Sequence, residues 1–154
     1  MANEIERKFL VRNPDIITAL QGQRFVQGYL STSKHATVRV RVADSQAWLT
    51  IKGITQGIAR QEFEYPIPAA DADAMLQSLA LPGIIDKTRY RLPAGELCWE
   101  IDVFHGDNQG LIIAEIELSH EQQTFDRPDW LGQDVSHDRR YFNSALSQRP
   151  FTTW

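Results

Sequence analysis

The sequence predicts an α+β fold: a closed eight-stranded antiparallel β-barrel, or tunnel, with a charged interior and flanking helices. Apolar and charged residues alternate with a period of two along most of the 154-residue chain, as expected for strands whose two faces meet different surroundings. Short turn-like segments separate these strands, which is typical of an antiparallel meander. About eight strands can close into a barrel that holds one small ligand, and closure removes exposed strand edges.

Eight strands are expected in chain order, over residues 4–8, 24–33, 36–43, 47–54, 59–67, 84–92, 96–104 and 111–119. A short helix is expected after the first strand, because Asn13 is a helix-capping residue type and Pro14 suits the first helical position. The chain from residue 1 to residue 154 is predicted to form one domain, since its length suits a single hydrophobic core.

Two further helices are expected outside the sheet. The segment 70–81, which a Pro-Gly pair ends, places three apolar residues on one stripe: Met75, Leu76 and Leu79. Ser136 is the predicted cap of a last helix that runs to residue 146. The outward face of the strands is apolar and needs a cover, which the first of these helices and the C-terminal segment around Trp130 and Tyr141 can supply.

Composition excludes several classes of protein. A formal net charge of -4 argues against a nucleic-acid surface, because the phosphate backbone requires a basic excess. The single cysteine, Cys98, cannot form an internal disulfide or a cysteine-ligated metal site. No apolar run approaches the roughly 20 residues of a membrane helix, and a charged strand follows Met1. We therefore expect a cytoplasmic protein with no nucleic-acid or membrane partner. The sequence leaves the oligomeric state open, with a homodimer among the options.

One face of the predicted strands carries most of their charge. Its charged residues are Glu4, Glu6, Lys8, Arg39, Arg41, Lys52, Arg60, Glu62, Glu64, Lys87, Arg89, Arg91, Glu100, Asp102, Glu115 and Glu117. A half-solvated sheet explains the alternation within any one strand. Within a strand, however, the charges are mostly grouped by sign, and a face selected only for solubility would mix signs to avoid repulsion.

Two kinds of ligand would compensate these groups of like charge. A hard divalent cation takes carboxylate oxygens as ligands, and a polyanion would pair with the lysines and arginines. A sheet that carries both sets has the parts for metal-assisted chemistry on a phosphate chain. The four histidines are dispersed at turns and strand ends, so they enter no predicted site.

The first strand contains the motif E-x-E-x-K as Glu4-Ile5-Glu6-Arg7-Lys8. Supporting segments follow in order: Arg39-Val40-Arg41, Lys52-Gly53, Arg60-Gln61-Glu62-Phe63-Glu64, Lys87-Thr88-Arg89, Trp99-Glu100-Ile101-Asp102 and Ala114-Glu115-Ile116-Glu117. With these segments the chain resembles the CYTH domain family, also called triphosphate tunnel metalloenzymes, over roughly residues 3–118.

The resemblance implies a closed antiparallel tunnel in which a triphosphate is hydrolysed or cyclised with Mg²⁺ or Mn²⁺. By position, the implied metal ligands are Glu4, Glu6, Glu115 and Glu117. The implied phosphate clamp consists of Lys8, Arg39, Arg41, Lys52, Lys87 and Arg89. The catalytic candidates are Lys8, Glu62, Glu100 and Asp102; the acids among them hold a second metal, orient water or only pair with arginines.

The expected activity is hydrolysis of inorganic tripolyphosphate to pyrophosphate and phosphate, because the predicted tunnel face offers charge but no surplus of aromatics to stack a base. Cyclisation of ATP to cyclic AMP and hydrolysis of thiamine or nucleoside triphosphates remain alternatives. A non-catalytic module that binds polyphosphate or a nucleotide is a further alternative, disfavoured because paired carboxylates would repel an anion without a metal between them. The expected partner is thus a small-molecule triphosphate.

Overall fold

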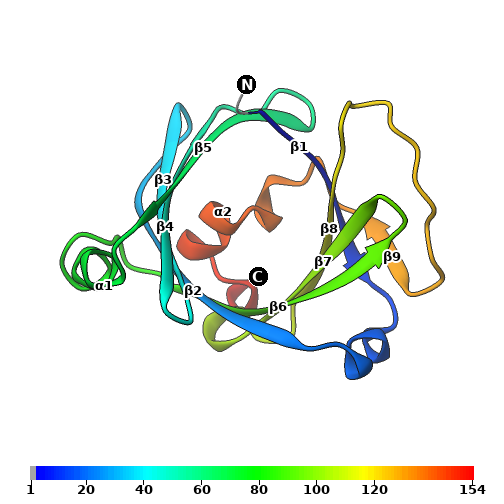
Figure 1. Cartoon of the computed structure of the whole chain (residues 1–154), viewed down its shortest axis with the longest axis horizontal. Helices are drawn as coiled ribbons and strands as arrows, with labels where there is room; N and C mark the ends of the chain where they lie inside the picture. Colours follow the sequence, from blue (N-terminus) through cyan, green and yellow to red (C-terminus); the bar gives the residue numbers. More distant parts are fainter. Residues whose placement is uncertain (1–2) are drawn as a thin grey trace.

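The computed structural model describes residues 3–154 and shows a ring of eight antiparallel strands (Figure 1). The strands of the ring are β1 (Asn3–Val11), β2 (Gly22–Ser33), β3 (Ala36–Ala43), β4 (Gln46–Gly53), β5 (Ala59–Ile67), β6 (Ile85–Ala94), β7 (Leu97–Phe104) and β8 (Ile112–Glu117). Their order round the ring is β1-β5-β4-β3-β2-β6-β7-β8, and β8 returns to β1. The antiparallel strand succession predicted from the alternation is confirmed.

Strand β1 joins the two halves of the ring. Its first residues pair with β5, where Glu4 lies opposite Arg60, and its later residues pair with β8, where Lys8 lies opposite Glu115. A short ninth strand, β9 (Leu131–Asp134), pairs with the last residues of β1, from Phe9 to Val11. The sequence analysis did not predict β9, because four residues carry too little alternation to be recognised.

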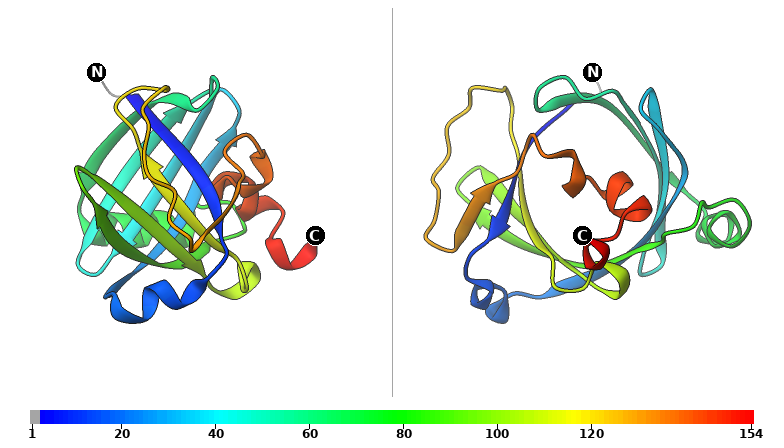
Figure 2. Two further views of the ribbon diagram at one scale, coloured as in Figure 1. Left: turned by 90° about the vertical axis from the view of Figure 1, so that its right-hand side faces the viewer. Right: turned by 180° about the vertical axis from the view of Figure 1, so that it is seen from behind.

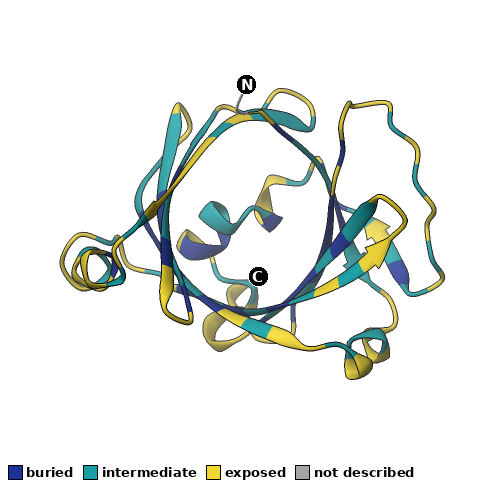
Figure 3. Cartoon of the chain, in the orientation of Figure 1, coloured by how far each residue is buried: buried dark blue, intermediate teal, exposed yellow. Residues whose placement is uncertain are grey.

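Two apolar coverings protect the outside of the ring. Helix α1 (Ala69–Ser78) lies against β3 and β4, where Ala72 is buried beside Val40. Met75 and Leu76 pack against this cluster, as predicted. The prediction for Leu79 is wrong: the helix ends at Ser78, and the Leu79 side chain is 62% exposed. Figure 3 shows that the outer surface of α1 and the loops carry most of the exposed residues.

The second covering is an aromatic cluster on the outside of β1 and β7. The Trp99 ring is 2% exposed and meets Phe9, Phe125 and Trp130 edge to face, with centroid separations of 5.8, 5.8 and 5.3 Å. Phe125 and Trp130 belong to the long connection between β8 and β9. Edge-to-face pairs add to the apolar burial and fix this connection against the ring.

The C-terminal segment lies at one end of the ring, as Figure 2 shows from the side and from behind. We call residues 135–148 the C-terminal plug; it contains η3 (Arg139–Tyr141) and α2 (Asn143–Gln148), and η4 (Phe151–Thr153) follows. Four side chains from inward strand positions pack against Val135, Tyr141 and Leu146 of the plug: Tyr29, Ile85, Phe104 and Ile113. The interior is therefore apolar at this end, whereas the prediction placed charge throughout the interior. The expected outer cover is confirmed for Trp130 and wrong for Tyr141, which packs inside the end of the ring.

The predicted last helix from residue 137 to residue 146 is in fact two short helices. Phe142 is extended between them, with φ -68° and ψ 138°, and this turn carries the next residues towards the interior. Asp138, not Ser136, caps the first of them by accepting a hydrogen bond from the Arg140 backbone N–H. The Ser136 hydroxyl instead accepts one from the Lys8 backbone N–H at 2.9 Å, which ties the plug to β1.

The remaining helices are short. The turn η1 (Pro14–Ala19) is a 3₁₀ helix that Asn13 caps, as predicted, by accepting a hydrogen bond from the Asp15 backbone N–H. A second 3₁₀ turn, η2 (Gly106–Asn108), follows β7. Within residues 3–154, every helix is too short or too polar to cross a lipid bilayer.

Leu146 anchors the plug, so Leu146→Ala should lower the free energy of unfolding by about 2–5 kcal/mol, because a fully buried side chain leaves a cavity when it is truncated. The matched control is Leu79→Ala, which should change that free energy by less than about 0.5 kcal/mol because Leu79 is exposed. Urea denaturation measures both. Equal effects would show that the plug does not contribute to the core.

Candidate active site

The ring encloses a cavity of about 220 Å³ that is lined almost entirely by charge. Its cations are Lys8, Arg39, Arg41, Lys52, Arg60, Lys87, Arg89 and Arg91. Its carboxylates are Glu4, Glu6, Glu62, Glu64, Glu100, Glu115 and Glu117, and the uncharged residues are Tyr29 and Asn143. Of the residues predicted for the site, the structure brings all but Asp102 to the wall of this one cavity.

The two signs of charge occupy different parts of the ring. Three adjacent strands, β7, β8 and β1, form an acidic arc, in which Glu100 lies opposite Glu115 and Glu6 lies opposite Glu117. Three other adjacent strands, β6, β2 and β3, form a basic arc with Arg39, Arg41, Lys87, Arg89 and Arg91. The two strands between the arcs, β4 and β5, carry both signs: Lys52, Arg60, Glu62 and Glu64. The arcs meet where the β6 arginines face the β7 acids, so neighbouring strands compensate part of the charge that the sequence shows as grouped by sign.

The acidic arc contains carboxylates that form no close ion pair with any cation of the described residues. Glu6 and Glu117 form no ion pair within residues 3–154. Burial raises the pKa of Glu6 well above its ordinary range, and the charges of Glu115 and Glu4 raise it further. Burial also raises the pKa of Glu117. Like charges opposite one another are unfavourable, so these oxygens form the part of the wall most in need of a cation.

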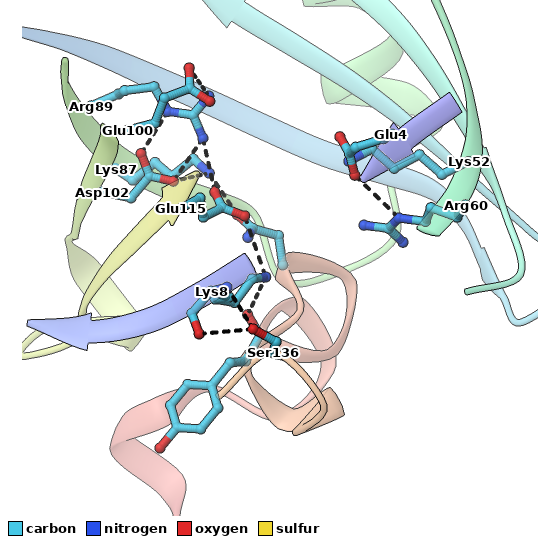
Figure 4. A network of polar contacts seen from close by, with 12 residues as sticks. Glu4, Lys8, Lys52, Arg60, Lys87, Arg89, Glu100, Asp102, Glu115 and Ser136 are labelled. Carbon is cyan, nitrogen blue, oxygen red and sulfur yellow. Dashed lines mark hydrogen bonds and ion pairs between the residues drawn. The ribbon is translucent and has the colours of Figure 1, made fainter. Parts of the chain in front are cut away.

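Glu4 is already compensated, although it belongs to the same arc. Lys52 Nζ lies 2.9 Å from Glu4 Oε2, and Arg60 Nε lies 3.5 Å from Glu4 Oε1 (Figure 4). Burial opposes ionisation of Glu4, but these two cations outweigh it and hold its pKa below the ordinary range. Burial and the nearby Glu4 charge raise the pKa of Glu62 to about 7, even though Lys52 lies 3.4 Å from it.

Lys87, Arg89 and Asp102 form a buried cluster of ion pairs where the two arcs meet (Figure 4). Asp102 is 1% exposed; it accepts a hydrogen bond from Lys87 Nζ at 2.8 Å and bonds from Arg89 Nε and Nη2 at 2.7 and 2.9 Å. Asp102 therefore lies behind the cations, which explains why it does not reach the cavity. Arg89 extends from this anchor to Glu100 at 3.2 Å and Glu115 at 3.3 Å.

The pKa of Lys87 is lowered to about 7, first because the side chain is buried and then because Arg89 and Arg41 are close. The charge of Asp102 acts in the opposite direction, but Arg89 already shares that carboxylate. Burial likewise lowers the pKa of Arg41 to about 9, together with the charges of Arg39 and Arg89. The basic arc thus holds cations that lack enough negative partners within the protein.

Lys8 connects the acidic arc to the plug. Its Nζ donates a hydrogen bond to the Tyr141 carbonyl oxygen at 3.2 Å and lies 3.6 Å from Glu115 Oε2. The same ammonium lies 5.0 Å from the centroid of the Phe142 ring, and the Arg60 guanidinium lies 5.3 Å from it on the way to Glu4. Two residues of the plug therefore support cations of the cavity wall.

Sequence reasoning missed two polar residues that contact the predicted clamp. Gln27, which is fully buried, accepts a hydrogen bond from Arg41 Nε at 2.8 Å. Asn143 accepts hydrogen bonds from Lys87 Nζ at 2.9 Å and from Gln27 Nε2 at 3.0 Å. Gln27 shares the inward parity of β2 with Tyr29, so alternation could have placed it, but Asn143 follows an irregular turn that carries no periodic signal.

A ring of antiparallel strands around a cavity lined by facing acidic and basic arcs defines the class of tunnel-like domains that handle anionic chains. Within it, the CYTH domain model matches residues 2–149, and the chain belongs to this family. The chain is 42% identical over 151 residues to an inorganic triphosphatase of Acetivibrio thermocellus, covering 98% of this chain and 97% of that protein. It is 38% identical over 150 residues to an inorganic triphosphatase of Nitrosomonas europaea, covering 94% and 96%.

Solved structures agree with this assignment. A crystal structure of an inorganic triphosphatase superposes with a TM-score of 0.67 at 33% identity, and the match covers 96% of this chain and 95% of that one. A putative adenylate cyclase from Bacillus halodurans superposes with a TM-score of 0.60, covering 79% and 84%. At 17% identity, this second likeness shows the shared fold alone.

The lowered pKa of Lys87 gives stability a pH dependence that Lys87→Met should remove. Between about pH 7 and the ordinary lysine value of 10.5, the unfolded chain binds one more proton at Lys87 than the folded chain. The free energy of unfolding of the wild type should therefore rise relative to that of the variant across this range. Urea denaturation at pH 7, 8 and 9 measures the difference, and a constant or falling difference would contradict the assignment.

Proposed function

We propose that this protein hydrolyses inorganic tripolyphosphate to pyrophosphate and phosphate with the help of a divalent cation. The observation that carries the proposal is the cavity, in which a basic arc faces an acidic arc within one enclosed space. A condensed phosphate chain offers negative oxygens to the first arc, and a cation bound to it offers positive charge to the second. The triphosphatase names of the relatives at 42% and 38% identity support the same substrate class.

The basic arc lacks the anions that it needs. Arg39 Nε is a buried donor without a hydrogen-bond acceptor among the described residues. Such a donor costs free energy unless a ligand supplies an oxygen. Arginine and lysine side chains bind phosphate oxygens by charge-assisted hydrogen bonds. We assign phosphate binding to the six predicted cations, Lys8, Arg39, Arg41, Lys52, Lys87 and Arg89, and add Arg60, which lines the same wall.

A divalent metal fits the acidic arc by the chemistry of its donors. Glu6, Glu115 and Glu117 present carboxylate oxygens to one cavity, and two of them have no cationic partner among residues 3–154. Mg²⁺ and Mn²⁺ are hard cations that prefer such oxygens. Within the described residues, no group of three or more histidine, cysteine or acidic side chains is placed to hold a metal ion, so the proposal needs phosphate oxygens of the substrate as further ligands.

We therefore assign metal binding to Glu6, Glu115 and Glu117, with Glu4 joining them if Lys52 turns to the substrate. When bound, such an ion supplies charge stabilisation to the phosphoryl oxygens during transfer. The protein side chains do the rest by position: the basic arc aligns the chain, and the buried walls keep the cations from reorganising. Phosphoryl transfer requires little more from the protein than this.

Glu62 is the proton acceptor in this proposal. Its pKa of about 7 is suited to taking a proton from an attacking water near neutral pH, and its carboxylate faces the cavity beside Lys52. Glu100 pairs with Arg89 at 3.2 Å and Arg91 at 3.6 Å, so we assign it to orienting the basic arc. Asp102 takes an anchoring role, because Lys87 and Arg89 separate it from the cavity.

The lining favours a substrate without a base. Tyr29 is the one aromatic residue among the residues that line the main cavity, and it packs into the apolar cluster of the plugged end. Purine or thiazole recognition usually needs an apolar stacking surface. The cavity wall therefore selects for charge alone, which favours inorganic tripolyphosphate over ATP or thiamine triphosphate.

The activity assay measures phosphate released from tripolyphosphate, pyrophosphate, ATP and thiamine triphosphate, each with Mg²⁺, Mn²⁺ or EDTA, and cyclic AMP formed from ATP. We expect one phosphate and one pyrophosphate per tripolyphosphate, only with a metal. Glu6→Gln should lower this rate by about 100-fold or more, because a metal ligand loses its charge. Glu96→Gln, in an exposed turn, is the control and should retain the rate. Cyclic AMP as the main product would overturn the proposal.

Metal binding should be visible without turnover. Burial and the neighbouring carboxylates raise the pKa of Glu6, so a divalent cation that binds this carboxylate competes with a proton. Titration of the wild type with Mn²⁺ by calorimetry at pH 6, 7 and 8 should therefore show an affinity that rises with pH. Glu6→Gln should bind Mn²⁺ more weakly and with a smaller dependence on pH. The same affinity and the same pH dependence in the variant would place the metal elsewhere.

A further inference from the structure

Two cations of the basic arc are linked through a pair of neutral amides. Lys87 Nζ donates to Asn143 Oδ1 at 2.9 Å, and Gln27 Nε2 donates to the same oxygen at 3.0 Å. Gln27 Oε1 in turn accepts from Arg41 Nε at 2.8 Å. These four side chains come from β6, the C-terminal plug, β2 and β3, so one hydrogen-bonded chain crosses the basic arc and ends at the plug.

The linked groups are held on all sides. Gln27 is 0% exposed and Lys87 is 1% exposed, so neither can exchange these bonds for water at little cost. The Arg41 guanidinium lies 4.5 Å from the Phe25 ring centroid, and the Lys87 ammonium lies 5.5 Å from that of Phe104. Within the described residues, Gln27 is the one side chain that accepts a hydrogen bond from Arg41.

A neutral acceptor does something that a carboxylate cannot do. It fixes the direction of a cation but leaves its charge available to an anion, whereas a carboxylate would neutralise it. Lys87 already shares Asp102 with Arg89. A second carboxylate at residue 143 would remove the positive charge from the wall, and an apolar residue there would leave the ammonium free to turn.

We propose that Asn143 and Gln27 form a neutral bridge that positions Lys87 and Arg41 as one unit for phosphate binding, so that the C-terminal plug is part of the substrate site. The proposal rests on the proposed function, because it takes the phosphate chain as the ligand of the basic arc. Asn143 and Gln27 are positioning residues: they act on the substrate through Lys87 and Arg41. The bridge makes the reach of both cations depend on where the plug holds Asn143.

The test measures tripolyphosphate affinity by calorimetry in EDTA, where no hydrolysis occurs. Asn143→Leu and Gln27→Leu should each weaken binding by about 10-fold, the effect of losing one charge-assisted hydrogen bond. The double variant should bind about as weakly as either single variant, because the bridge acts as one unit. Independent effects would multiply to about 100-fold and would overturn the proposal, as would unchanged affinity in the single variants.

Charge variants test whether the bridge has to be neutral. Asn143→Asp keeps the acceptor for Lys87 but adds a negative charge, and Gln27→Glu does the same towards Arg41. Both should bind tripolyphosphate at least about 10-fold more weakly while circular dichroism shows a folded protein. Retained affinity in these variants would overturn the proposal, because the bridge would then not have to be neutral. If either leucine variant fails to fold, the affinities of these two charge variants decide the test instead.

Ser144→Ala is the matched control, because it lies next to Asn143 in α2 but outside the lining of the main cavity. Its affinity should equal that of the wild type. In metal-containing assays the leucine variants should raise KM more than they lower kcat, since the lost interaction is made in the bound state as well as during transfer. A wild type that binds tripolyphosphate but does not hydrolyse it would overturn the proposed function and leave the bridge standing.

Discussion

The structure depends on one constraint: charges taken out of water must meet opposite charge or a hydrogen-bond partner where they are buried. The ring meets it by register. Arg89 lies opposite Asp102 and Lys52 opposite Glu62, so neighbouring strands compensate charges that repel along a single strand. Among residues 3–154 the compensation is incomplete on both arcs: Glu6 faces Glu117 across β1 and β8, and Arg39 has a buried donor without an acceptor. The first site lacks a cation and the second lacks an anion, and both line one cavity. A polyanion with a bound metal ion would supply both.

The apolar parts of the fold make this arrangement rigid. The aromatic cluster around Trp99 holds β1 and β7 from outside, and the plug packs into the ring from one end. The strands that carry the wall are therefore held in place before any ligand arrives, so little backbone reorganisation is needed when it binds. Gly83, with a φ of +101°, lies so close to the Ser147 carbonyl that a β-carbon would come within 1.8 Å of the oxygen. The turn before β6 thus fits directly against the plug.

The alternation of apolar and charged residues predicts the strands and most residues of the cavity wall, because inward and outward residues differ in polarity in nearly every strand. It fails where that contrast is missing. The inward residues of β2, Phe25, Gln27 and Tyr29, are uncharged, so the pattern of charge does not assign them to the wall, and β9 is too short to show alternation. Alternation correctly predicts that Asp102 points into the ring. It does not predict that Lys87 and Arg89 lie between this carboxylate and the cavity. The position of Asn143 depends on a turn at Phe142 that only tertiary packing selects.

The plugged end gives the cavity a direction. A ligand that enters from the side opposite the plug meets the apolar floor around Tyr29 and Leu146 and cannot thread through the molecule. Both fragments of a cleaved chain must then leave by the route that admitted the whole, one after the other. A polymer with many phosphate units would have to keep its excess length outside. The blind end therefore limits how much of a phosphate chain the cavity can hold.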